Sequence, residues 1–370
     1  MFEKVNPSHP DKVADRIAGA IVDLCYTKSR NPKVACEVLI GHGECNIQVE
    51  TSEQISAEDI EDIVRRIAGD GFQTYELIVP QDQNLAANQE QGVRCGDNGI
   101  FKAVPPTHEQ KLLTAIAASI YGRWPYDGKY IVNSTEPIPS RALLSADENL
   151  ELEVKMRRRC DIMEEMDELL TPIRTFNKEE EKRWNGLVDE NNKIRKRLHE
   201  LIEKEERIAR EMRVLNFTIC QSNAEEKEIR DFLSSQLSTL NYQLKVNPLG
   251  EWTGGLNTDS GATNRKLGSD MGDGVTGGGL MGKDLSKCDV SINIACFLKA
   301  VHSGRVVTAV CSIGDEEVTF TYTDGTQETE RFADIVEQAR LYILTDCNGS
   351  FERFAEWGLL RPLAQMKSEK

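Results

Sequence analysis

Apolar positions along the chain follow two periods, and these predict an interleaving of helices and strands. Spacings of three and four residues predict helices over residues 10–26, 56–71, 107–121, 225–240 and 332–344. Alternating or continuous apolar runs predict strands over residues 33–40, 46–51, 76–80, 215–221, 242–246, 306–312 and 318–322. We therefore expect an α+β fold with two or three domains, in which residues 332–344 form the last clear helix.

Two of these helices have strong signals at their ends. Ser56 with Asp59, and Thr107 with Gln110, have the spacing of a capping box, in which side chain and backbone cap the first turn reciprocally. Gly122 is expected to end the helix that Thr107 begins, because glycine readily adopts the backbone conformation that follows a last helical turn.

A charged segment, residues 134–212, has a different pattern. It contains two long stretches in which apolar residues recur at heptad-like spacing. The predicted seam comprises Leu152, Met156, Met163, Met166 and Leu170, then Trp184, Leu187, Ile194, Leu198, Leu201, Ile208 and Met212, with polar Asn191 and Glu205. This pattern predicts an inserted antiparallel helical hairpin. It is either a solvated structural insertion, which we favour, or an arm for a partner that the sequence does not identify.

Composition narrows the class of protein. The chain of 370 residues is 39% hydrophobic and 29% charged, which is typical of a soluble globular protein. A net charge of −16 argues against a nucleic-acid surface, because phosphate contacts need clustered cations. No apolar run approaches the roughly 20 residues that span a bilayer, and the N-terminus lacks a signal-peptide pattern. The ten cysteines form no CxxC pair, which favours a reducing cytoplasm over a disulfide framework.

The chemistry is concentrated in residues 252–291, a stretch rich in glycine and charge with few bulky side chains. Glycine is unfavourable inside helices and strands, but it allows tight turns that present backbone N–H groups to anions. Cations that suit phosphate oxygens are Arg265, Lys266, Lys283 and Lys287. Carboxylates that suit a divalent metal are Asp259, Asp270, Asp273, Asp284 and Asp289. A flexible linker is the alternative, and we favour a phosphate cradle.

Several short motifs occur along the chain in the order in which a known enzyme family has similar motifs. They are SHPDKVADRIAGAIVD, VACEVLI, VETS, CGDNGIF, DGKYIVN, NPLGEWTGG, TDSGATNRK, GGG and GKDLSKCD. In this order they resemble the S-adenosylmethionine synthetase (methionine adenosyltransferase) family. The resemblance implies three similar α/β domains interleaved in sequence, and a helix after Ser286 although residues 290–296 alternate like a strand. The implied division is 1–95 for the N-terminal domain, 96–133 with 213–250 for the central domain, 134–212 for the inserted hairpin, and 251–370 for the C-terminal domain.

The resemblance also implies roles for individual residues. Catalytic contacts to the phosphates would come from His9, Lys129, Arg265, Lys266, Lys283 and Lys287. Methionine and adenosine would contact Glu50, Gln83 (or Gln81 in its place), Asp97, Trp252, Asp259 and Ile313. Two Mg²⁺ ions would be held by Asp11 and Asp289, and K⁺ by Glu37. In this family two subunits meet face to face and share their active sites, so we expect a homodimer or homotetramer.

The implied reaction transfers the adenosyl group of ATP to L-methionine and then cleaves tripolyphosphate to pyrophosphate and phosphate. The methionine sulfur is already nucleophilic, so cations facing the leaving group would supply the catalysis. Five departures from the family pattern bear on its rate, affinity and tripolyphosphatase activity. The glutamate before the HPD string is absent, and three other positions hold Thr276, Asn264 and Val290 where the family has histidine, glycine and arginine. The lid loop over residues 81–99 is also short.

Two other functions are compatible with these motifs. One is an enzyme of the same fold that uses a changed acceptor or acts mainly as a polyphosphatase, which activity on methionine analogues would reveal. The other is a catalytically silent scaffold that works through the helical hairpin. The scaffold predicts that deleting residues 140–210 abolishes function whereas Lys283→Ala does not, and the enzyme predicts the reverse.

Overall fold

The structure, a computed structural model, describes residues 1–82, 92–134, 146–170, 178–212 and 214–362. It divides into two compact units. The main unit comprises Met1–Asn133, Phe217–Gln236 and Leu244–Lys370, and the helical unit comprises Ser134–Asn216 and Leu237–Gln243. None of the described helices is both long enough and apolar enough to cross a membrane.

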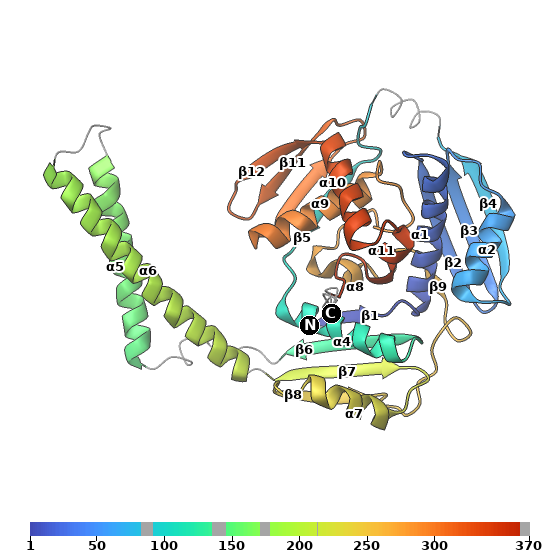
Figure 1. Ribbon diagram of the computed structural model, residues 1–370, viewed down its shortest axis with the longest axis horizontal. Helices are drawn as coiled ribbons and strands as arrows, with labels where there is room; N and C mark the ends of the chain where they lie inside the picture. Colours follow the sequence, from blue (N-terminus) through green and yellow to red (C-terminus); the bar gives the residue numbers. More distant parts are fainter. Residues whose placement is uncertain (83–91, 135–145, 171–177, 213, 363–370) are drawn as a thin grey trace, which may run out of the picture. The chain divides into compact units, whose positions relative to one another are not determined.

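The described strands form three four-stranded sheets (Figure 1). The β2 sheet has the order β4 (Gln73–Pro80), β3 (Glu44–Thr51), β2 (Val34–Gly41), β9 (Gly261–Ala262). The β6 sheet has the order β1 (Phe2–Val5), β6 (Gly128–Ser134), β7 (Leu215–Gln221), β8 (Tyr242–Val246). The β10 sheet has the order β12 (Gln327–Arg331), β11 (Glu317–Tyr322), β10 (Val307–Cys311), β5 (Gly99–Ala103). Every sheet therefore joins segments that are far apart in the sequence.

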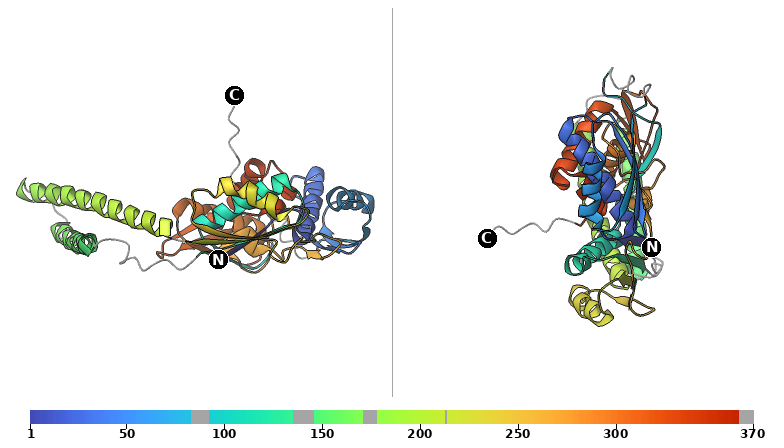
Figure 2. Two further views of the ribbon diagram at one scale, coloured as in Figure 1. Left: turned by 90° about the horizontal axis from the view of Figure 1, so that it is seen from below. Right: turned by 90° about the vertical axis from the view of Figure 1, so that its right-hand side faces the viewer.

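Helices of the main unit lie on one side of its sheets (Figure 2). They are α1 (Pro10–Lys28), α2 (Ala57–Ala68), α4 (His108–Arg123), α7 (Glu226–Gln236), α8 (Leu267–Met271), α9 (Cys288–Ser303), α10 (Phe332–Asp346) and α11 (Phe351–Trp357). Helix α1 packs against β2 and α11, and α9 packs against β5, β10 and α10. One continuous apolar core joins the β2 and β10 sheets with α1, α2, α9, α10 and α11, which gives the loops between them a rigid support.

Local signals placed most helix starts correctly. Both predicted capping boxes are present, at Ser56 and at Thr107. The helix predicted after Ser286 is α9, and its buried alternating residues are helical. The prediction that Gly122 ends a helix is wrong, because α4 continues to Arg123 and the Trp124 N–H still bonds to the carbonyl of Ile120 at 2.8 Å. The Trp124 ring packs edge-on against Phe232, and this tertiary contact outweighs the glycine signal.

Other boundaries also differ from the prediction. Helix α7 ends at Gln236 rather than at residue 240, because residues 237–240 form a turn that leads toward β8. Helix α11 follows α10, so residues 332–344 do not hold the last helix. Asp23 of α1 explains α11, since its carboxylate accepts from the N–H groups of Phe351 and Glu352 at 2.7 and 3.1 Å. Ser350 is the local N-cap of α11 and accepts from the Arg353 N–H at 3.2 Å, whereas the additional cap from Asp23, 328 residues away along the chain, has no local signal.

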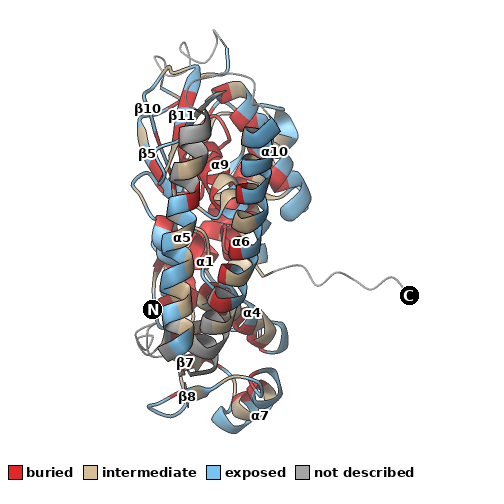
Figure 3. Cartoon of the chain, turned by 90° about the vertical axis from the view of Figure 1, so that its left-hand side faces the viewer, coloured by how far each residue is buried: buried red, intermediate tan, exposed pale blue. Residues whose placement is uncertain are grey.

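The helical unit contains α5 (Ala146–Leu170) and α6 (Lys178–Met212), which pack together. Their ion pairs include Glu151 with Arg197 and Glu190 with Arg158. The partner number falls in α6 as it rises in α5, so the two helices run in opposite directions. Buried positions recur along both helices (Figure 3) and comprise Ile162, Leu187, Ile194, Leu198 and Leu201, with Leu152 packed against the first four.

One seam prediction in this unit is wrong. The side chain of Met156 is 57% exposed, and Ile162 occupies the seam instead. The antiparallel register pairs Arg158 with Glu190 on the neighbouring surface, so the seam turns away from Met156. The side chains of Met163, Met166, Leu170, Glu205, Ile208 and Met212 lie outside the described part of the structure.

Candidate functional site

The first turn of α1 forms one half of the candidate site. His9 is the N-cap of this helix, and Pro10 occupies its first turn, where a missing N–H costs nothing. Asp11 is 2% exposed, and its Oδ1 accepts from the N–H of Ala262 at 2.9 Å. Gly261 makes this approach possible, because a Cβ there would overlap the carbonyl group of Pro10. The glycine-rich stretch is therefore held against the start of α1.

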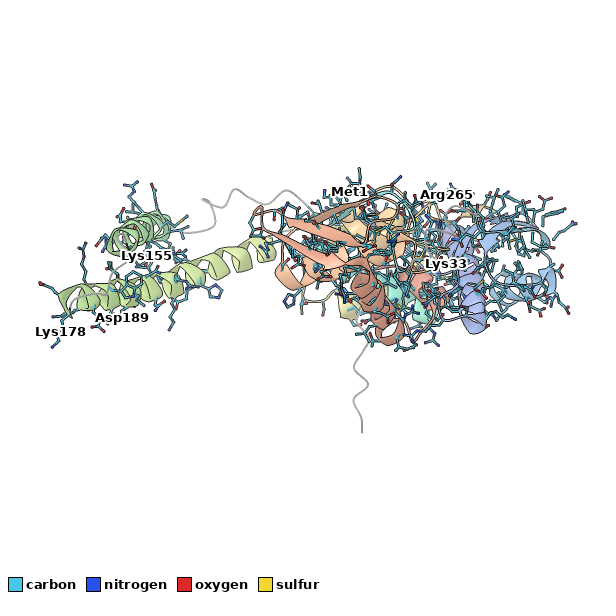
Figure 4. All side chains as sticks on the ribbon, turned by 90° about the horizontal axis from the view of Figure 1, so that it is seen from above. Met1, Lys33, Lys155, Lys178, Asp189 and Arg265 are labelled. Carbon is cyan, nitrogen blue, oxygen red and sulfur yellow. The ribbon has the colours of Figure 1, made fainter. Side chains whose placement is uncertain are left out.

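Cations gather around this carboxylate. Arg265 Nη1 lies 3.5 Å from Asp11 Oδ1, and Lys266 Nζ lies 3.8 Å from Asp11 Oδ2. Lys129 on β6 joins them through Glu3, whose carboxylate lies 3.0 Å from Lys129 and 3.6 Å from Lys266. The side chain of Arg265 is 58% exposed and is labelled in Figure 4. We call His9, Asp11, Lys129, Arg265 and Lys266 the α1 cluster.

His9 is a neutral hydrogen-bond donor in this cluster. Burial, together with the charges of Lys266 and Lys129, lowers the pKa of His9 from 6.5 to about 3. Its Nδ1 accepts from the backbone N–H of Asp11 at 3.2 Å. The proton of the neutral ring is therefore on Nε2, where it can donate to an anion without adding charge.

Asp127 is a site residue that sequence reasoning missed. It precedes Gly128 in the DGK turn, from which only Lys129 was selected. Asp127 is 6% exposed, its Oδ2 accepts from the N–H of Gly255 at 2.8 Å, and its Oδ1 has no partner among the described residues. Burial, with the charges of Asp259 and Asp11, raises the pKa of Asp127 to about 6. The signal that could have found it is the D-x-K spacing itself.

The other half of the candidate site surrounds the start of α9. Lys283 Nζ lies 2.6 Å from Asp289 Oδ2 and also donates to the carbonyl of Gly278. Burial raises the pKa of Asp289, and the Lys283 charge opposes that rise. Asp97 and Lys287 act electrostatically on the same carboxylate. We call Asp97, Lys283, Lys287 and Asp289 the α9 cluster.

The remaining predicted residues occupy different positions. Glu37 on β2 accepts from the Thr263 hydroxyl. Ile313 follows β10 and donates its N–H to Asn98, the neighbour of Asp97, at 2.8 Å.

The side chains of Glu50 and Trp252 make no hydrogen bond or ion pair in the part of the chain that the structure describes. Glu50 is on the exposed face of β3, and Trp252 lies near Asp127 across Gly254. Asp259 acts on His9 electrostatically, and Gln83 lies outside the described residues.

Two carboxylates that the sequence suggested as metal ligands have structural roles instead. Asp270 is fully buried and receives two hydrogen bonds from Lys12 Nζ, at 2.7 and 2.8 Å. Asp284 is 1% exposed and accepts from the N–H groups of Val34 and Ser286, both at 2.7 Å. Their oxygens already accept from protein donors, so these two carboxylates hold the fold together, and we do not include them in the proposed metal sites.

The two clusters have the chemistry of a polyanion site. The α1 cluster offers three cations and a neutral imidazole donor, and the α9 cluster offers two lysines beside glycine-rich turns. Among the described residues, no group of three or more His, Cys, Asp or Glu side chains is arranged to hold a metal ion alone. A magnesium ion held by one or two carboxylates and by phosphate oxygens fits this donor set.

Comparisons with known proteins agree with this geometry. Residues 1–84 match the family described as S-adenosylmethionine synthetase, N-terminal domain. The chain is 28% identical over 316 residues to an S-adenosylmethionine synthase of Fusobacterium nucleatum, covering 78% of this chain and 68% of that relative. It is 25% identical over 347 residues to an S-adenosylmethionine synthase of Salinibacter ruber, covering 88% of this chain and 78% of that relative.

The fold has a solved counterpart. An unusual S-adenosylmethionine synthetase from Campylobacter jejuni matches with a TM-score of 0.59 at 16% identity, covering 97% of this chain and 93% of that chain. At that identity the likeness concerns the fold alone. The motifs, the cation clusters and the matched N-terminal domain lead to one conclusion. Together these findings support a divergent member of the S-adenosylmethionine synthetase family, whose N-terminal domain is matched by residues 1–84.

Proposed function

We propose that this protein transfers the adenosyl group of ATP to L-methionine, forming S-adenosylmethionine, and cleaves the tripolyphosphate to pyrophosphate and phosphate. The observation that carries the proposal is the pair of cation clusters beside glycine-rich turns. The methionine sulfur attacks C5′ of ATP, the C5′–O5′ bond breaks, and its electron pair leaves with the tripolyphosphate. No proton moves in this step, so no general base is required.

The residues of the α1 cluster suit the departing oxygen. His9 Nε2–H is an uncharged donor, and Lys129, Arg265 and Lys266 are cations that can face the charge developing on the leaving group. Glu3 holds Lys129 and Lys266 until a polyanion replaces it. We propose that Asp127, through its unpartnered oxygen, accepts a hydrogen bond from the substrate.

Metal ions fit the carboxylates near these cations. Asp11 and Asp289 would hold Mg²⁺ together with phosphate oxygens, and Glu37 would hold K⁺. Magnesium supplies charge neutralisation of the polyphosphate when it is bound. In the described structure Asp289 is paired with Lys283, and we propose that ATP draws Lys283 toward its phosphates and frees this carboxylate.

We further propose that two copies of the chain complete each other's sites in a homodimer or homotetramer. The exposed sheet faces support this, because they carry apolar residues without cover: Leu39 and Leu77 on the β2 sheet, and Ile100 and Val310 on the β10 sheet are 50% to 67% exposed. The proposal also includes three similar interleaved domains, which comprise residues 1–95, 96–133 with 213–250, and 251–370. Residues 134–212 are proposed to be an insertion into the central domain. The described cysteines are free, which supports a reducing compartment such as the cytoplasm.

The test is an incubation of the purified chain with ATP, Mg²⁺, K⁺ and methionine, measuring S-adenosylmethionine and the released phosphates together. We expect the sulfonium product, and we expect it to disappear in Lys283→Ala. Lys111→Ala is the matched control, since Lys111 is an exposed lysine on α4 remote from both clusters in sequence. Phosphate release without the sulfonium product would contradict the proposal and point to another acceptor. A folded protein with no turnover would point to the scaffold function.

A further inference from the structure

Asn264 links the two clusters through its backbone and its side chain. The backbone of Asn264 is in the left-handed region, with φ of +62°, which asparagine tolerates better than most other residues. Its N–H donates to Asp15 Oδ1 on α1 at 2.8 Å. Arg265 and Lys266 of the α1 cluster follow directly, so the hydrogen bond to Asp15 fixes where the segment that bears these cations lies against α1.

The side chain of Asn264 holds a second segment. Its Oδ1 accepts from the backbone N–H groups of Leu280 and Met281, each at 2.8 Å, and its Nδ2 donates to the carbonyl of Met281 at 3.3 Å. The amide group thus uses both of its ends. Gly279 packs directly on it, since a Cβ at Gly279 would lie 2.7 Å from Asn264 Cγ. Any side chain at Gly279 would push the clamp open.

The clamped segment leads directly into Lys283. On its other side, the carbonyl of Gly282 accepts from the Cys36 N–H on β2 at 2.7 Å. Residues 280–282 are therefore held between Asn264 and β2, and Lys283 emerges from this support to reach Asp289. Of the cations in the two clusters, Arg265 and Lys266 follow Asn264 itself, and Lys283 follows the segment that Asn264 holds.

We propose that Asn264 is a positioning residue that sets the spacing between the two cation-bearing segments, so that both face one polyphosphate. This assignment rests on the proposed function. Glycine at this position would allow the same backbone but would leave the N–H groups of Leu280 and Met281 without their acceptor. Alanine would lose the clamp and also strain the backbone, so glycine is the cleaner substitution.

The experiment compares Asn264→Gly with Asn348→Gly. Asn348 is also left-handed, with φ of +52°, and it is exposed, so this control makes the same change on a similar backbone away from both clusters. Binding of inorganic tripolyphosphate with Mg²⁺ is measured by calorimetry, and hydrogen exchange is followed in peptides that cover residues 279–283. Asn264→Gly should weaken binding about tenfold, which is what loss of one or two hydrogen bonds at a preorganised site produces, and should speed the exchange.

A second variant guards against a general folding defect. Asn264→Asp keeps an oxygen that accepts from both amides, so exchange in residues 279–283 should stay as slow as in the wild type. Unchanged tripolyphosphate binding in Asn264→Gly would overturn the positioning role, and so would weaker binding with unchanged exchange. Failure of the wild type to bind tripolyphosphate would instead overturn the proposed function, and the role of Asn264 in it would fall for that separate reason.

Discussion

Lys12 is the residue whose loss should damage the fold most clearly. Its Nζ is fully buried between two carboxylates, at 3.0 Å from Asp15 Oδ2 and at 2.7 and 2.8 Å from the oxygens of Asp270. Burial alone would lower the pKa of Lys12, but the charges of Asp15 and Asp270 outweigh burial and raise it. Among the described side chains, Lys12 is the only cation that is hydrogen-bonded to the carboxylates of Asp15 and Asp270. Lys12→Met therefore leaves two buried negative charges without a bonded counter-charge.

The magnitude follows from the burial. Breaking a buried ion pair by removing one partner costs about 3–5 kcal/mol, because the remaining charge is desolvated and unpaired. At roughly 2–4 °C for each kcal/mol in a domain of this size, the unfolding temperature should fall by about 10 °C. The loss should be larger at pH 8 than at pH 5. Unpaired buried carboxylates have a folded pKa above the unfolded value, so stability is lost as pH rises through the folded pKa.

The assay is thermal unfolding followed by circular dichroism at both pH values. Lys111→Met is the control, because it makes the same substitution on the exposed surface of α4. It should shift the unfolding temperature by no more than about 2 °C. Adding Asp270→Asn to Lys12→Met should recover part of the loss, since it removes one of the two buried charges. An unfolding temperature for Lys12→Met equal to that of the control would refute the reasoning.

Three further predictions concern single positions. Asp127→Asn should raise the unfolding temperature at pH 8 but not at pH 4. The pKa of Asp127 is about 6 in the folded protein against an ordinary 3.8, so ionising this buried carboxyl costs about 3 kcal/mol at most. This cost to the folded state appears as pH rises through the folded pKa, and the variant avoids it. An equal gain at both pH values would contradict this. Gly261→Ala should abolish tripolyphosphate binding and lower the free energy of unfolding by about 1–3 kcal/mol, because the added Cβ overpacks against α1. Gly277→Ala is the control, since a Cβ at Gly277 meets open space, and it should change neither quantity. Calorimetry measures the binding, and thermal unfolding measures the stability. Ile162→Ala should cost about 2–5 kcal/mol of packing energy and so speed limited proteolysis of the helical unit. Val154→Ala, at an exposed position, should leave the rate of proteolysis unchanged. Equal rates for the two variants would exclude Ile162 from the seam.

Local patterns in the sequence determined much of the secondary structure, because the interactions involved are close along the chain. The capping boxes at Ser56 and Thr107 each act within four residues, and the alternation of β2 and β3 records which face is buried. The strands β1, β5, β9 and β12 were not predicted. β5 pairs with β10, more than two hundred residues later, so its hydrogen-bonding partner is invisible to a local pattern.

The candidate site divides in the same way. The residue types of the glycine-rich stretch predicted a polyanion site, and its family motifs named most of the cations that the structure brings together in the α1 and α9 clusters. Which carboxylate serves the site and which serves the fold depended on tertiary structure alone. Asp289 stands beside Lys283 in the α9 cluster, whereas Asp270 is buried against Lys12, although the two aspartates look alike in the sequence. Burial and the nearest donor decide the role of a carboxylate, and both are set by segments that only folding brings together.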